Sequence, residues 1–456
     1  MVNIKTSNEC VVTNCPQSII DIAKKTLSIK NPTYEKICRI SGSRFAAQEY
    51  FRYYSIPKNT IGEIHFPRGF RTRFKRYLDK TKIEYHEEES FISNKSNEMD
   101  KWSPVILRDY QIPIVKQVVD GVAEGVIFAG VGSGKTVMSC ELTRILKFKT
   151  TILCPTTIIM QQFIDEFKKW FDYDCAVFGD GKKEINKDVV VASWQSLSSD
   201  KQLANILYKR TGLLIIDESH GAISKERSRI LHQFSPARMI SLSGSPRRSR
   251  DDGRTDAIFF LLGEILAEHK LTQIIPSVEV VRSREVIPVS YNYHEMVDSM
   301  VNNDSRNTLI VGLTMMEILN GKKVLILTKR REHCQKLMDK LGNIKAYYAD
   351  SDDKNRNETL MRMRNGEEDF CVLVGTVSLL ATGLDIPSLD TVIFAGDIKS
   401  DVLIEQGAGR VLRLFEGKEE SLIYDIFDNL NPIFKNQAYD RFKFYKNKGW
   451  EVKGLK

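Results

Sequence analysis

Nine short apolar runs, rich in β-branched residues and separated by helix-length segments, restrict the fold of this chain more than any other feature. Runs that are apolar on both faces predict buried parallel strands, and their alternation with helices predicts sheets covered by helices. The first series comprises residues 126–129, 151–154, 189–192, 213–216 and 239–242, and the second 324–327, 371–374, 391–395 and 422–426. Two series therefore predict two α/β lobes in tandem.

Domain boundaries follow from where these series begin and end. We expect a small N-terminal α+β domain over residues 1–103, a first lobe over 104–263, a connector over 264–300, a second lobe over 301–430 and a basic, aromatic tail over 431–456. At about 150 residues per domain, a chain of 456 residues has room for three cores. Residues 278–281 and 286–289 of the connector also have strand-like composition.

Composition excludes several classes of protein. The eight cysteines form no CxxC pair, and no cysteine–histidine cluster has the spacing of a zinc site. This usage predicts a reducing, cytoplasmic setting. A signal peptide is not expected, because the N-terminus has no long apolar core, and the least polar stretch, residues 371–384, is too short to span a bilayer. The net charge of +8 is a mild bias toward polyanions.

A glycine-rich turn follows the first predicted strand. Ala129 is succeeded by Gly130, Gly132, Ser133, Gly134, Lys135 and Thr136. Backbone N–H groups of such a turn wrap phosphate oxygens, and the N-terminus of the next helix adds partial positive charge. We expect Lys135 to neutralise the β- and γ-phosphates of ATP and the Thr136 hydroxyl to bind Mg²⁺.

Two further segments complete a predicted nucleotide site. Asp217 and Glu218 directly follow the strand predicted over residues 213–216. Taken alone, the two carboxylates would indicate an acidic turn. Because they follow a phosphate-binding turn, they predict instead that Asp217 binds Mg²⁺ and that Glu218 is the base that orients water. Gln111 lies just before the first strand and can pair with N6 and N7 of adenine, and either Arg108 or Tyr110 can stack on the ring.

The order of these motifs resembles that of the superfamily-2 helicases and translocases. AxxGxGKT at 129–136, DESH at 217–220, SGSP at 243–246 and QxxGRxxR at 406–413 carry the resemblance, which covers residues 105–430. Within the superfamily, FGDGKK at 178–183 and RSRDDG at 248–253 resemble the UvsW-type branch-migration helicases of phages and their XPB-like relatives. The resemblance implies two RecA-like P-loop lobes.

Further roles are implied by this resemblance alone. Arg410 and Arg413 would be arginine fingers for the γ-phosphate, and Gln406 would position the γ-phosphate or the water. Gly383 and Asp385 are implied to lie near the ribose and to link ATP to the strand. Ser243, Ser245 and His220 are implied to couple the nucleotide site to the strand. His220 is alternatively a plain surface histidine. Residues implied to contact a nucleic-acid strand are Pro155, Thr156, Gln161, Ser193, Gln195 and Thr376. Their hydroxyl, amide and backbone groups suit phosphates rather than bases, so salt-sensitive binding without sequence preference is predicted.

Two basic segments lie outside the motif set. Residues 68–82 hold seven Lys or Arg against one acid, with aromatic residues at helical spacing. A helix there would bury its aromatic stripe and present cations such as Arg68, Arg71 and Arg73 to DNA, or form a solvated amphipathic face. The aromatic residues of the tail either stack on unpaired bases or pack against the second lobe.

The leading hypothesis is an ATP- and Mg²⁺-dependent DNA helicase or translocase that remodels forks, D-loops and Holliday junctions in recombination, repair or replication. Its partners would be single-stranded and branched DNA, with recombination or replication proteins. An RNA helicase and a non-unwinding, ATP-gated clamp or motor subunit are the alternatives, and a stimulation assay with DNA and RNA separates them.

Overall fold

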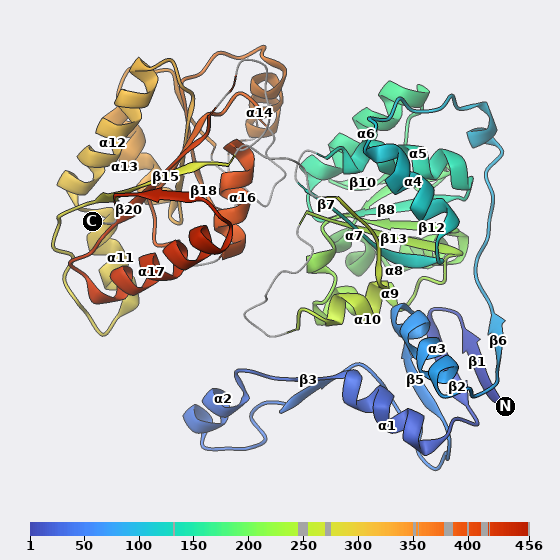
Figure 1. Ribbon diagram of the computed structural model, residues 1–456. Coiled ribbons are helices and arrows are strands. Elements are labelled where there is room, and N and C mark those ends of the chain that lie inside the picture. The colour runs from blue at the N-terminus through green and yellow to red at the C-terminus, as the bar shows by residue number, and fades with distance from the viewer. Residues whose placement is uncertain are drawn as a thin grey trace. The chain divides into compact units, whose positions relative to one another are not determined.

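The protein is described here by a computed structural model (Figure 1). The described residues are 1–130, 133–244, 254–269, 275–349, 353, 355–377, 386–398, 401–411, 418 and 420–454. The chain divides into two compact units, Met1–Leu271 and Thr272–Lys456. No helix in these described ranges is long and apolar enough to cross a membrane.

The first unit contains a sheet with the strand order β10-β9-β11-β8-β12-β13-β7-β14. Its strands are β7 (Glu124–Ala129), β8 (Thr150–Cys154), β9 (Ala176–Gly179), β10 (Lys182–Lys183), β11 (Val189–Ser193), β12 (Leu213–Ile216), β13 (Arg238–Ser243) and β14 (Ile265–His269). All pair in parallel except β10, which is antiparallel to β9. The five strands predicted for the first lobe are therefore confirmed.

Helices cover both faces of this sheet, which explains why its strands are apolar throughout. The helices are α4 (Gln111–Asp120), α5 (Lys135–Leu146), α6 (Thr157–Phe171), α7 (Trp194–Ser199), α8 (Lys201–Arg210), α9 (Lys225–Leu231) and α10 (Ala257–Leu262). Alternate strand residues enter two different cores: Ile127 and Ile152 pack with α4, α5 and α6, whereas Val126 and Leu153 pack with α7 to α10.

The second unit repeats this plan. Its sheet has the order β17-β18-β16-β19-β20-β15-β21, and the pairings are parallel. The strands are β15 (Ser277–Arg282), β16 (Val324–Thr328), β17 (Ala346–Tyr348), β18 (Val372–Thr376), β19 (Thr391–Phe394), β20 (Leu422–Phe427) and β21 (Glu451–Lys453). The helices are α11 (Tyr293–Val301), α12 (Asp304–Leu319), α13 (Arg331–Leu341), α14 (Arg356–Asn365), α16 (Asp401–Val411) and α17 (Pro432–Asn447).

The connector and the tail both contribute strands to the sheets of the two units. Residues 264–300 supply β14 to the first sheet and β15 to the second, because β14 pairs with β7 while β15 pairs with β20 and β21. Residues 286–289 form no strand. The tail forms α17 and β21, and Phe442 and Tyr445 are buried in the core of the second unit, which confirms the packing alternative.

The N-terminal part of the first unit is a small α+β domain, as predicted. Its sheet has the order β5-β2-β1-β6, and β3 pairs with β4 in an arm that carries α2 (Figure 1). These elements are β1 (Val2–Thr6), β2 (Glu9–Thr13), α1 (Gln17–Thr26), β3 (Ser28–Lys30), α2 (Tyr34–Ser41), β4 (Tyr50–Arg52), β5 (Ile64–Pro67), α3 (Arg71–Lys80) and β6 (Tyr85–Glu89). Phe70, Phe74 and Leu78 are buried in its core, as the helical spacing predicts.

Two of the predicted DNA-binding cations are buried inside this unit. Arg68 is 2% exposed and Arg71 is 5% exposed. Glu124, the first residue of β7, accepts hydrogen bonds from Arg68 Nη2 at 3.0 Å and from Arg71 Nε at 3.0 Å. The prediction that Arg68 and Arg71 contact nucleic acid is therefore wrong, because both side chains are buried and paired with carboxylates, Arg68 with Glu124 and Arg71 with Glu124, Glu87 and Glu89. Arg73 remains exposed, as predicted.

A buried histidine in the second unit makes a pH-dependent stability expected. Burial, and then the charge of Arg306, lower the pKa of His333 from 6.5 to about 3. Below pH 6.5 the unfolded chain binds a proton that the folded chain does not, so stability falls as the pH drops from 6.5 toward 3. We expect the second unit to lose about 2 kcal/mol between pH 7 and pH 5, measured by urea unfolding.

His333→Gln is expected to remove this dependence, because glutamine does not titrate and can still donate to Asn307 Oδ1, which lies 3.0 Å from His333 Nε2. His294→Gln is the matched control, since His294 is exposed. An unchanged slope in His333→Gln would contradict the prediction.

Candidate active site

The predicted site residues of the first unit gather at one edge of its sheet. Because β7, β8, β11, β12 and β13 are parallel, their carboxyl ends meet there, where ligands bind in open α/β sheets. The residues at or just beyond those ends are Gly130, Ser133, Gly134, Lys135, Thr136, Pro155, Thr156, Ser193, Gln195, Asp217, Glu218 and Ser243.

The glycine-rich turn leads directly into α5. Gly134 is the residue before the helix and has a φ of 71°, a left-handed conformation that glycine adopts without strain. Lys135 Nζ donates to the carbonyl oxygens of Ala129 at 3.0 Å and Gly130 at 3.3 Å, so the ammonium group lies at the root of the turn. Ser133 Oγ is buried without a hydrogen-bond partner among the described residues, which suits a site that receives a polar ligand.

Side chains at the start of α4 hold this turn. Gln111 Nε2 donates to the Ser133 carbonyl at 2.8 Å, and Tyr110 Oη donates to the same oxygen at 3.1 Å. Gln111 Oε1 accepts from the backbone N–H of Arg108 at 2.8 Å. Gln111 is 2% exposed. Its amide, predicted to pair with adenine, thus has a second role that the sequence did not indicate, which is to fix the phosphate-binding turn.

The contact between Gly134 and Gln111 predicts a specific effect of substitution. A Cβ at Gly134 would lie 2.3 Å from Gln111 Nε2, so Gly134→Ala must displace the amide from the Ser133 carbonyl in addition to straining φ. We expect the KM for ATP to rise about tenfold, equivalent to about 1.4 kcal/mol, in steady-state hydrolysis assays.

Gly366→Ala is the matched control, because Gly366 also has a positive φ of 78° but nothing lies within 4 Å of its Cβ position. Gly366→Ala should lose thermal stability from the strained φ alone, with the KM for ATP unchanged. Equal KM values for Gly134→Ala and the wild type would show that the turn tolerates the displaced amide.

The two carboxylates follow β12. Asp217 is 8% exposed, and burial, followed by the charge of Glu218, raises the pKa of Asp217 to about 7 while Lys135 lowers it. Glu218 has a φ of 49°, so the chain turns sharply after Asp217. Two carboxylates this close favour a bound cation, because it relieves their repulsion.

The donor set fits Mg²⁺ rather than a metal held by protein alone. In the described part of the chain, no group of three or more His, Cys, Asp or Glu side chains could hold a metal ion. Mg²⁺ is usually bound by one or two carboxylates together with substrate phosphates and water. The Thr136 hydroxyl and the Asp217 carboxylate, both at this edge, are the protein groups that would hold it.

The predicted strand-contacting residues have local structural roles. Thr156 caps α6 by accepting from the Ile159 N–H at 3.4 Å, and Ser193 caps α7 by accepting from the Ser196 N–H at 3.0 Å. Gln161 donates to Asp165 at 2.7 Å within α6. Gln195 is exposed, and Thr376 ends β18 in the second unit. Pro155 is half-buried beside the Thr156 cap.

Several predicted residues lie outside the described part of the chain. These are Gly132, Ser245, Gly383, Asp385 and Arg413. Gln406 and Arg410 lie on α16, and His220 lies in the turn after Glu218, but their side chains are not described. Gly407 lets α16 pack closely against β19, because a Cβ at this position would lie 2.8 Å from the ring of Phe394.

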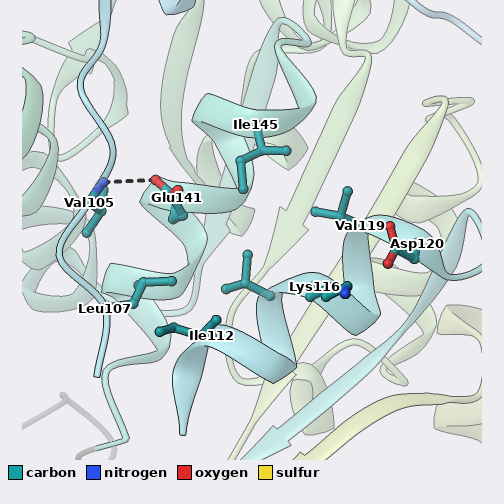
Figure 2. Close-up of a pocket in the computed structure, with 9 residues that line it drawn as sticks. Val105, Leu107, Ile112, Lys116, Val119, Asp120, Glu141 and Ile145 are labelled. Atoms are coloured by element: carbon teal, nitrogen blue, oxygen red, sulfur yellow. Dashed lines mark hydrogen bonds between the residues drawn. The ribbon is translucent and has the colours of Figure 1, made fainter. Parts of the chain in front are cut away.

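A cavity of about 400 Å³ lies between α4 and α5 (Figure 2). Its lining is mostly apolar, with Lys116, Asp120 and Glu141 as the charged members, and the Val105 N–H donates to Glu141 at 3.0 Å. The residues of α5 that line the cavity, Glu141 and Ile145, lie beyond the first turn of that helix, so the cavity is not part of the phosphate-binding turn.

Two family models match the chain. The model described as "Type III restriction enzyme, res subunit" matches residues 104–248, and the helicase conserved C-terminal domain matches residues 306–415. These ranges fall within the two predicted lobes.

Curated proteins similar to this chain come from phages, viruses and archaea. A probable helicase of Escherichia phage T5 is 27% identical over 354 residues, which cover 75% of each chain. The DNA 3′-5′ translocase XPB2 of Sulfurisphaera tokodaii is 22% identical over 371 residues, covering 70% of this chain and 81% of that protein.

Solved structures are similar at low sequence identity. The restriction-modification enzyme LlaBIII bound to DNA has a TM-score of 0.55 and 17% identity, covering 75% of this chain and 30% of that one. T4 UvsW has a TM-score of 0.44 and 18% identity, covering 99% of this chain and 98% of that one. The first of these supports the α/β fold of the two lobes.

Proposed function

Because this chain belongs to the superfamily-2 helicases, which hydrolyse ATP when bound to nucleic acid, we propose that it moves on DNA and remodels branched DNA such as forks, D-loops and Holliday junctions. The observation that carries the nucleotide part of this proposal is the turn that Gln111 holds at the carboxyl edge of the sheet. Lys135 lies at the root of this turn after β7, and Asp217 and Glu218 follow β12; both strands are parallel to β13, which lies between them.

The chemistry proposed for this edge assigns one task to each group. The turn N–H groups and Lys135 bind the β- and γ-phosphates. Thr136 and Asp217 would hold Mg²⁺, which would supply Lewis acidity to the phosphate oxygens. Glu218 orients the attacking water and accepts its proton. Gln111 anchors the turn and pairs with adenine, and Arg108 stacks on the adenine ring.

The remaining roles rest on the motif order. Arg410 and Arg413 act as arginine fingers that stabilise charge on the γ-phosphoryl group, and Gln406 orients the water. Residues proposed to couple the nucleotide to the strand are Gly383, Asp385, Ser243, Ser245 and His220.

DNA is proposed to be held through phosphates. The residues are Pro155, Thr156, Gln161, Ser193, Gln195 and Thr376, with the exposed Arg73 of the N-terminal domain. With Arg68 and Arg71 buried, this domain has fewer cations for DNA than its sequence indicates, so the salt dependence of binding is expected to be moderate. The similar proteins include both an RNA helicase and a DNA translocase by name. The choice of DNA over RNA therefore rests on the DESH motif at 217–220 and on the resemblance of FGDGKK and RSRDDG to the branch-migration helicases.

Steady-state ATP hydrolysis tests the proposal. It is measured without nucleic acid, with single-stranded DNA, with a four-way DNA junction and with a matched RNA, and Lys135→Ala is the control. Stimulation that is greatest with the junction and absent in Lys135→Ala supports a branched-DNA motor. Greater stimulation by RNA would favour an RNA helicase, and none would favour a clamp or a subunit of a larger machine.

A further inference from the structure

An aromatic stack lies beside the phosphate-binding turn. The ring of Tyr110 lies parallel to the imidazole of His269, with 4.3 Å between ring centroids and 4° between planes. His269 is the last residue of β14, where it pairs with Ala129, the last residue of β7. The stack therefore joins the start of α4 to the strand next to the root of the turn.

Tyr110 connects this stack to one peptide group of the turn. Its hydroxyl donates to the Ser133 carbonyl at 3.1 Å, and Gln111 donates to the same oxygen at 2.8 Å. In a planar trans peptide the carbonyl and the following N–H point in opposite directions. Holding the Ser133 carbonyl toward α4 therefore aims the Gly134 N–H away from α4.

The direction of that N–H matters for nucleotide binding, because backbone N–H groups of such a turn are the donors that surround phosphate oxygens. A donor already aimed before the ligand arrives binds it with less loss of conformational freedom. The Tyr110 ring must stay in place for its hydroxyl to reach Ser133, and stacking on His269 restricts that ring.

We propose that His269 is a positioning residue for ATP, acting through Tyr110 on the peptide between Ser133 and Gly134. The inference rests on the proposed nucleotide site and adds a residue that lies in no motif of the chain. His269 acts through its contact with the Tyr110 ring, so its effect falls on ATP affinity and not on the chemical step.

The test compares three variants of the full chain in steady-state ATP hydrolysis. His269→Ala removes the stack and is expected to raise the KM for ATP roughly 3- to 10-fold, with kcat within about twofold of the wild type. His269→Phe keeps a ring against Tyr110 and is expected to restore the wild-type KM. Tyr110→Phe keeps the stack but removes the hydroxyl, and is expected to raise KM like His269→Ala.

The double variant Tyr110→Phe/His269→Ala is expected to show the KM of a single variant, because both changes act on the same hydrogen bond from Tyr110 to the Ser133 carbonyl. Phe171→Ala is the matched control: it breaks a stack with Trp102 whose centroids are also 4.3 Å apart, in the same unit. Its thermal stability should fall while its KM stays unchanged.

The outcomes separate this inference from the proposed function. A wild-type protein that hydrolyses no ATP would remove the proposed function. A wild type that hydrolyses ATP, with Lys135→Ala inactive and His269→Ala unchanged in KM, would overturn only the role of His269. Failure of His269→Phe to restore KM, or an additive double variant, would also overturn it.

Discussion

Glu218→Gln is expected to lower the turnover of ATP by about 10²- to 10⁴-fold, the usual contribution of a positioned general base. Glutamine keeps the size of the side chain and its capacity to accept a hydrogen bond, but it cannot take up the proton of the attacking water. ATP should still bind, because Lys135 and the turn are unchanged. Single-turnover hydrolysis and equilibrium binding of ATP measure the two effects separately.

The control for this result is Glu226→Gln, which removes one negative charge from an exposed position on α9 of the same unit. Its turnover should match that of the wild type. If Glu218→Gln retained turnover within tenfold of the wild type, another group would have to accept the proton, and the role proposed for Glu218 would be wrong.

Glu124→Gln is expected to destabilise the first unit by about 3–5 kcal/mol, the cost of removing one partner from a buried ion pair. Burial already lowers the pKa of Arg68, and Glu124 is the carboxylate that supports its charge. Arg71 retains Glu87 and Glu89 as partners, so Arg68 is the cation left without one. Urea unfolding measures the loss of stability, and hydrogen exchange of the backbone amides in β1, β2 and β7 shows where it falls.

The matched control is Glu88→Gln, because Glu88 lies in the same domain but its side chain is 59% exposed and pairs with the exposed Lys5. We expect a change under about 0.5 kcal/mol there. Adding Arg68→Met to Glu124→Gln should recover part of the stability by removing the unpaired charge. A loss of unfolding free energy in Glu124→Gln no larger than that in Glu88→Gln would show that water reaches Arg68 and Glu124.

Nine strands of the two lobes could be predicted from sequence because each is apolar on two faces and occupies a separate run, whereas β9, β10 and β17 were not predicted. β12, for instance, has the predicted bounds Leu213–Ile216. The assignment of β14 and β15 to different sheets could not be predicted, since both lie in one segment and strand partners are set by tertiary pairing. The formation of β21 by the tail could not be predicted for the same reason, because β21 pairs with β15 at the edge of the second sheet.

The site shows a similar division. Lys135, Asp217 and Glu218 were identifiable because their chemistry requires fixed residue types beside particular strands. The burial of Arg68 was not, because its partner Glu124 is far away in the sequence and the same basic helix could equally face solvent. His269 gave no signal at all, since stacking on Tyr110 depends on β14 lying next to β7.

The edge of the second sheet has a mechanical consequence. β15, near the beginning of this unit, runs parallel to β21, which ends the described chain, and three residue pairs join them from Ser277 and Glu451 to Glu279 and Lys453. Tension between the start of the unit and its C-terminus would pull these strands in opposite directions along their length. All the hydrogen bonds of the ladder would then share the load at once, so the unit should resist being stretched by its ends better than being peeled open from one side.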